Sequence, residues 1–201
     1  MSGAEVQADD VLVDARVRGV WWKEQRLLVD DDGVTWRGRH IPFDEITAVS
    51  YWSTHGALEV GCEFRLHTAG TKTHIGFRAS NDEQYAVFTS AIGALRTHVE
   101  PRLVHEMLGV LDAGQDVTVT SLRLNRAGFG RGKPPVPWEA IVAIRPPAVR
   151  PPRKAIIGDM LVFARNDGGE VVRIADIFYE RPNGPVLPAL ISACVARYGR
   201  R

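Results

Sequence analysis

Short runs in which apolar and polar residues alternate predict that most of the chain forms β-strands. In residues 13–18 (VDARVR), apolar and charged side chains alternate, which is the pattern of a strand with one buried face. Asp32-Gly33 is a hairpin-turn signal between the apolar runs at 27–29 and 34–36. The same criteria predict strands at residues 46–51 and 142–145, and strand–turn–strand segments within 64–77 and 161–176.

Three segments show helical spacing instead. Residues 81–96 carry an apolar stripe, and Ser80 with Glu83 predicts a capping box at the start of this helix. A second stripe runs from about residue 185 to 198, after an Asn-Gly turn. Between them, residues 101–112 place five apolar side chains on one helical face: Leu103, Val104, Met107, Leu108 and Leu111. We expect this face to be buried against a neighbouring unit or a second chain, because exposed it would form a sizeable apolar patch.

The chain contains an internal repeat. Residues 27–49 align without a gap with residues 122–144, and the correspondence continues, with a shifted offset, into the strands that follow. The identical positions fall at a turn glycine, a strand-starting proline and apolar sites, which favours two structurally equivalent units. The identities are Leu27/Leu122, Gly33/Gly128, Pro42/Pro137, Ile46/Ile141 and Ala48/Ala143.

The patterns therefore predict that each unit is a series of antiparallel strands followed by one helix, so the predicted fold class is α+β and mostly β. This arrangement resembles the pleckstrin-homology-like (PH-like) domain found in bacterial proteins, here as a tandem pair. The residues that carry the resemblance are Gly33, Ile41, Pro42, Phe43, Ile46 and the Ser80-capped helix, then Gly128, Val136, Pro137, Trp138, Ile141 and the Pro185 helix. The second unit departs from the first by an insertion after Ile144 and by Arg131 in place of Trp36.

The resemblance implies two curled antiparallel sheets, each capped by its C-terminal helix. The expected organisation is a first PH-like domain at residues 10–98, a linker helix at 99–113 and a second PH-like domain at 114–201. It also implies a non-enzymatic binding scaffold, whose ligand does not carry over because the same fold serves many partners.

Composition narrows the protein class. The chain has 201 residues, 45% hydrophobic and 24% charged, which are globular values. No apolar stretch approaches the roughly 20 residues of a membrane-spanning helix, and the acidic N-terminus lacks a secretory signal pattern. Cys62 and Cys194 lie far apart and are interpreted as reduced thiols in the core. We therefore expect a cytoplasmic protein.

The charge is divided unequally. Residues 1–100 contain 10 Lys and Arg against 15 Asp and Glu, whereas residues 101–201 contain 15 against 9. The two units could have different partners or attract one another, and drift in surface charge explains the asymmetry equally well.

Two groups of residues are candidate binding sites. The insertion at 145–154 (RPPAVRPPRK) combines four prolines with four cations, so it could present charge to an anion or an acidic partner on a stiff backbone, or be a solvated loop. Its cations and those of a neighbouring loop are Arg145, Arg150, Arg153, Lys154, Arg131 and Lys133. The second group is a possible aromatic interface, and the alternative is that these rings cover the ends of the sheet: Trp21, Trp22, Tyr51 and Trp52.

No sequence motif indicates catalysis, a metal or a cofactor. His67 and His74 flank a hairpin and could face each other across it, but no acidic third ligand lies nearby. The glycine-rich segment at 128–133 matches no phosphate-binding motif.

We therefore expect a non-enzymatic adaptor that needs no cofactor, acts on no small-molecule substrate and binds a protein partner or itself. Two alternatives stay open: peripheral binding to an anionic membrane, and nucleic-acid binding by the basic C-terminal half.

Overall fold

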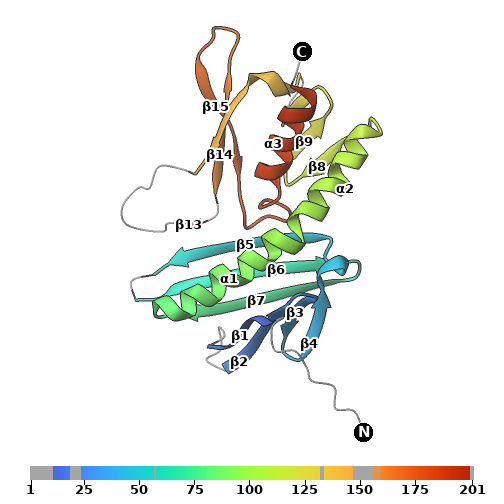
Figure 1. The fold of residues 1–201 in the computed structure, drawn as a ribbon. Coiled ribbons are helices and arrows are strands. Elements are labelled where there is room, and N and C mark those ends of the chain that lie inside the picture. The colour runs from blue at the N-terminus through green and yellow to red at the C-terminus, as the bar shows by residue number, and fades with distance from the viewer. Residues whose placement is uncertain are drawn as a thin grey trace.

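The computed structural model describes residues 11–18, 24–56, 58–131, 134–146, 156–157 and 159–199. Within these residues the chain is an α+β structure, mostly β, with antiparallel strand pairing throughout. In Figure 1 the N-terminal half lies at the bottom and the C-terminal half at the top, with two consecutive helices running between them.

The first half consists of two antiparallel meanders and a helix. The first sheet has the order β1-β2-β3-β4, and the second contains β5, β6 and β7 in sequence order. Helix α1 lies across the second sheet and packs on β1, β6 and β7 (Figure 1). The bounds are β1 (Val11–Arg18), β2 (Glu24–Asp30), β3 (Gly33–Trp36), β4 (Arg39–Pro42), β5 (Ala48–His55), β6 (Val60–Thr68), β7 (Thr71–Ala79) and α1 (Asp82–His98).

The second half repeats this element order. A four-stranded sheet of order β11-β10-β9-β8 is followed by a three-stranded sheet of order β12-β14-β15 and then by α3. The bounds are β8 (Val117–Val119), β9 (Leu122–Asn125), β10 (Gly128–Gly130), β11 (Val136–Pro137), β12 (Ile141–Arg145), β14 (Met160–Arg165), β15 (Val171–Ile177) and α3 (Leu187–Tyr198).

The repeated residues occupy matching positions in the two halves. Gly33 pairs with Pro42 across β3 and β4, and Gly128 pairs with Pro137 across β10 and β11. A Cβ atom on either glycine would overlap a carbonyl oxygen of the opposite strand, so both positions require glycine. A short 3₁₀ helix follows each proline, and the first residue of each helix is a buried aromatic, Phe43 or Trp138.

The turns before these glycines are also built alike. The Asp30 Oδ1 atom accepts hydrogen bonds from the backbone amides of Asp32 and Gly33. The Asn125 Oδ1 atom does the same for Ala127 and Gly128. Both are turns in which a short polar side chain caps its own backbone, which explains why Asp and Asn exchange at this position of the repeat.

The helical predictions need one correction at a cap and one at a boundary. The N-cap of α1 is Asn81, whose side chain accepts from the Gln84 amide, while the Gln84 side chain accepts from the Ser80 amide. The reciprocal cap is thus centred one residue later than the predicted Ser80–Glu83 box, because Asn is as good a cap as Ser. Helix α3 begins at Leu187, two residues after the predicted start.

A helix occupies the predicted segment between the halves. Helix α2 (Glu100–Asp112) follows α1 after the single residue Val99 and contacts α1, α3 and β8. Leu103 and Leu111 are fully buried, and the other three residues of the predicted apolar face pack against the same core. The burial expected for this face is confirmed within one chain for Leu103 and Leu111, and the other three residues are half-buried.

Two segments of the second half cover the outer edge of β5. Strand β13 (Ile156–Ile157), which follows the proline-rich segment at 145–154, pairs antiparallel with Thr54 and Ser53 of β5. Further along the same edge, the Tyr51 amide donates to the Tyr179 carbonyl and the Asn183 amide donates to the Val49 carbonyl. The sheet of the first half is therefore completed by backbone from the second.

Candidate functional site

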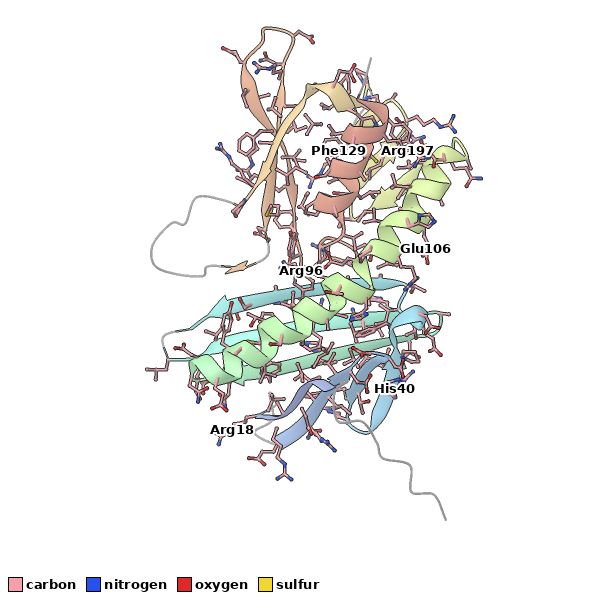
Figure 2. All side chains as sticks on the ribbon, viewed as in Figure 1. Arg18, His40, Arg96, Glu106, Phe129 and Arg197 are labelled. Carbon is pink, nitrogen blue, oxygen red and sulfur yellow. The ribbon has the colours of Figure 1, made fainter. Side chains whose placement is uncertain are left out.

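The junction of the two halves contains a buried polar network. The Arg96 Nε atom donates to the Tyr51 hydroxyl at 3.0 Å, and this hydroxyl donates to the Glu100 Oε1 atom at 2.9 Å. Glu100 is only 9% exposed, and burial raises the pKa of its carboxyl, against the opposing effects of Tyr51 and Arg96. Three elements, β5, α1 and α2, thus supply one hydrogen-bonded chain (Figure 2, where Arg96 is labelled).

Tyr179 connects this network to the second half. Its ring meets the ring of Tyr51 edge-on, with centroids 5.5 Å apart, while the Arg96 guanidinium lies 5.5 Å from the Tyr51 ring centroid. Burial raises the pKa of Tyr179 to about 12 and also raises the pKa of Tyr51, so both phenols are neutral at physiological pH. The network therefore contains one cation, Arg96, and one carboxyl group, that of Glu100, in surroundings from which water is partly excluded.

A cavity of about 270 Å³ lies beside the network, between α1 and the second half. Its wall is mainly apolar and aromatic, with one charged side chain from each half. Helix α1 supplies Tyr85, Phe88, Thr89, Ile92 and Arg96, and the second half supplies Pro146, Asp159, Met160 and Tyr179. A concave, mostly apolar space with few polar groups is the usual form of a ligand site.

Asp159 is the unusual residue of this cavity. Its Oδ1 atom is buried and has no hydrogen-bond partner among the residues that the structure describes. Burial raises the pKa of this carboxyl, and the negative charges of Glu180 and Asp176 raise it further. Because Oδ1 is closed off from solvent, a donor in the cavity would reach the Asp159 carboxylate through its other oxygen, Oδ2.

The predicted cationic site is only partly described. Arg131 is exposed on the loop after β10, and the Arg145 guanidinium lies over the Phe163 ring, 4.3 Å from its centroid. Lys133, Arg150, Arg153 and Lys154 lie outside the described residues. The structure therefore gives one defined contact for this group, an intramolecular one that places Arg145 on the face of the β12-β14-β15 sheet.

The predicted aromatic group divides in the same way. Trp21 and Trp22 lie outside the described residues, whereas Tyr51 and Trp52 are 3% and 7% exposed. Neighbouring strand residues point to opposite faces, so both faces of β5 are covered at this point. Tyr51 belongs to the junction network, and the Arg65 guanidinium lies 4.4 Å from the Trp52 ring centroid.

The histidine and cysteine interpretations can also be compared with the structure. His67 and His74 do not face each other, because the register pairs His67 with Lys72 and His74 with Arg65. The His74 Nε2 atom instead lies within hydrogen-bond distance, 2.9 Å, of the Glu63 Oε2 atom. Cys62 and Cys194 are buried and unpaired by a disulfide, as predicted. Among the described residues, no group of three or more His, Cys, Asp or Glu side chains is placed to hold a metal ion.

Comparison with protein-family models, with curated proteins and with solved structures gives no match. Within the described part of the chain, no helix has the length and apolar character needed to cross a membrane.

The junction residues were missed in the sequence because their signals are non-local. Glu100, Arg96 and Asp159 are ordinary charged residues in sequence, and the contacts that make them unusual join positions far apart in the chain. One signal was present: the Asn183-Gly184 turn before α3. Asn183 adopts a positive φ of 59° and bonds to β5 through backbone and side chain.

Proposed function

We propose that this chain is a non-enzymatic adaptor built from two PH-like units and that its partner is a protein. The observation that carries the proposal is the repeated architecture. Each half has a four-stranded meander, a second meander and a closing helix, with the same glycine–proline register at the same place. Two similar β units connected by helices can hold their binding surfaces at a fixed position relative to each other.

The distribution of exposed apolar side chains supports a protein partner. Large apolar side chains that remain exposed in the described chain concentrate in the second half, on β12, on β15 and just after it. They are Val142, Val171, Val172 and Phe178, whereas the first half exposes Leu12 and Leu58 and α2 exposes Val110. Val171 and Val172 are neighbours in β15 and point to opposite faces of the sheet, so each face offers an exposed apolar side chain that a protein could cover.

The strand edges support the same conclusion. The outer edge of β5 in the first half is covered by β13 and by residues 179–183. The corresponding edge strand of the second half, β12, pairs only with β14 among the described residues. Strand β12 itself exposes Val142, and an uncovered edge strand with an exposed apolar side chain favours binding of an extended segment of a partner by strand addition.

The test compares two matched surface variants of the full chain. The sheet variant carries Val142→Thr, Val171→Thr and Val172→Thr, which keep β-branched side chains and so the strand propensity. The control variant carries Leu12→Thr and Leu58→Thr on the exposed surface of the first half. Proteins captured from the producing cells by immobilised wild type are identified, purified and titrated against all three forms, and self-association is measured by light scattering.

We expect wild type and control to bind the partner equally and the sheet variant to bind it at least tenfold more weakly. Parallel assays use phosphatidylserine vesicles and duplex DNA. Sedimentation with the vesicles or a shift of the DNA, with no protein partner and no self-association, would contradict the proposal and favour the membrane or nucleic-acid alternative.

A further inference from the structure

We propose that the cavity between α1 and the second half binds a basic side chain, lysine or arginine, of a protein partner. This inference rests on the proposed adaptor function and specifies what one part of the molecule recognises. The ligand chemistry is an organic cation on an aliphatic stem, with its charged end at Asp159 and its stem against the apolar wall.

The size and lining of the cavity suit such a side chain. Its volume of about 270 Å³ lies just below the range of about 300–1,000 Å³ that is typical for whole small-molecule ligands. Tyr85, Ile92 and Met160 provide the apolar surface along which a methylene stem packs. Lysine and arginine keep their stems on apolar surface while the charged head meets a polar group, which here is the carboxylate of Asp159.

The electrostatics of the cavity favour a cation at the Asp159 end. Among the described residues the Asp159 carboxylate has no hydrogen-bond or ion-pair partner, and Asp176 and Glu180 add negative charge around it. Its Oδ1 atom is closed off from solvent, so a cation in the cavity would meet the other oxygen, Oδ2. Of these neighbours, Asp176 is already paired with Arg173. Asp159 is therefore the acceptor that remains for a guanidinium or ammonium donor, and bonds to charged groups are stronger than neutral ones.

Arg96, a cation that lines the same cavity, does not change this assignment. Its Nε atom donates to Tyr51, its guanidinium lies over the Tyr51 ring, and the Glu100 carboxyl lies one hydrogen bond further on. Arg96 thus has its own partners within the chain. An anionic ligand filling the cavity would have to place its charge near the unpaired carboxylate of Asp159, which is unfavourable.

The experiment measures binding by NMR on the isotope-labelled full chain. The probes are Nα-acetyl-lysine amide and Nα-acetyl-arginine amide, with Nα-acetyl-norleucine amide as the uncharged match and Nα-acetyl-glutamate amide as the anion. We expect both cationic probes to shift the resonances of Thr89, Asp159 and Met160, and the norleucine and glutamate probes to bind at least tenfold more weakly.

Asp159→Asn should reduce the affinity for the cationic probes at least tenfold, whereas Asp167→Asn, in the exposed β14–β15 turn, should leave it unchanged. The Asn variant removes a partly buried charge without changing the side-chain shape, so we expect it to fold, with an unchanged spectrum outside the cavity. Equal binding of the norleucine probe, unchanged binding by Asp159→Asn, or preference for the glutamate probe would overturn the cation site.

A second arm distinguishes a partner's side chain from a free small cation. Tenfold tighter binding of 1,4-diaminobutane than of Nα-acetyl-lysine amide would overturn the side-chain assignment, and comparable or weaker binding supports it. The failure of the adaptor function appears elsewhere, as equal partner binding by the sheet variant and wild type. Unshifted cavity resonances count against the cation site alone.

Discussion

The two halves have the same strand order and the same glycine–proline register, but their second sheets end differently. In the first half, the edge strand β5 receives β13 and the Tyr179–Asn183 segment from the second half. In the second half, the edge strand β12 has no strand on its outer side in the described residues. One edge thus joins the halves, and the other carries no further strand among the described residues.

The two halves also differ in their aromatic packing and in the outline of their second sheets. In the first half, Phe64 of β6 and Phe77 of β7 pack against Phe88 of α1. The second half extends its β14–β15 hairpin away from α3 into solvent (Figure 1). Under the proposed adaptor function, the first half is the packed body of the molecule and the second half presents its sheet to the partner.

The largest expected effect tests whether the halves unfold together. Phe64→Ala in the first core and Phe129→Ala in the second should each cost about 3–5 kcal/mol of unfolding free energy, since both side chains are fully buried. Because β5 receives backbone from the second half, we expect each variant to lower a single calorimetric transition. Two transitions, of which each variant lowers only one, would show that the halves are independent and that the joined edge is weak.

The next prediction acts on the joined edge itself. Asn183→Ala removes the side chain that accepts from the Val49 amide and places alanine at a φ of 59°, so we expect a loss of about 1–3 kcal/mol. Hydrogen exchange at the Val49 and Tyr51 amides should accelerate. Asn183→Gly keeps the backbone conformation accessible and should lose only the side-chain part.

The matched control for this edge is Asn166→Ala. Asn166 also caps backbone, by accepting from the Glu170 amide, but within the β14–β15 turn of the second half. Asn166→Ala should leave the rate of hydrogen exchange at the β5 amides unchanged. Equal acceleration in both variants would mean that β5 responds to any loss of stability and that Asn183 does not hold it specifically.

These residues also show how far the sequence could predict the molecule. Gly33 and Gly128 were recognisable because a turn is a local feature, and the apolar face of α2 because helical spacing is local too. The contact of Asn183 with Val49 and the hydrogen bond of Tyr51 with Glu100 join distant parts of the chain. No local pattern encodes such pairs, which is why the cavity and its unpaired Asp159 could not be predicted.

A third prediction concerns pH and the junction cavity. The pKa of Asp159 is raised in the folded state, mainly by burial, so the folded chain binds its proton more tightly than the unfolded chain. The ordinary pKa of an aspartate is 3.8. As the pH rises from below this value through the raised pKa of Asp159, the unfolding free energy of wild type should therefore fall relative to that of Asp159→Asn. Melting temperatures measured across this range should diverge, with the variant higher at neutral pH.

The matched comparison for this pH effect is Asp167→Asn, which changes an exposed carboxylate in the second half. Its melting temperature should follow that of wild type across the whole range. A constant difference between Asp159→Asn and wild type at every pH would show that the Asp159 carboxyl has the same proton affinity in both states, and that its burial is not costly.

The smallest expected effect compares one cation–aromatic pair from each half. In the first half, Arg65 of β6 covers Trp52 of β5, and in the second, Arg145 of β12 covers Phe163 of β14. Arg65→Ala and Arg145→Ala should each cost about 0.5–1 kcal/mol of stability, measured by denaturant titration. The two variants should differ in binding, because only Arg145 lies on the uncovered edge strand. We expect Arg145→Ala to lower the affinity for the captured partner and Arg65→Ala to leave this affinity unchanged. An equal loss of affinity in both variants would show that the difference between the two edges has no functional consequence.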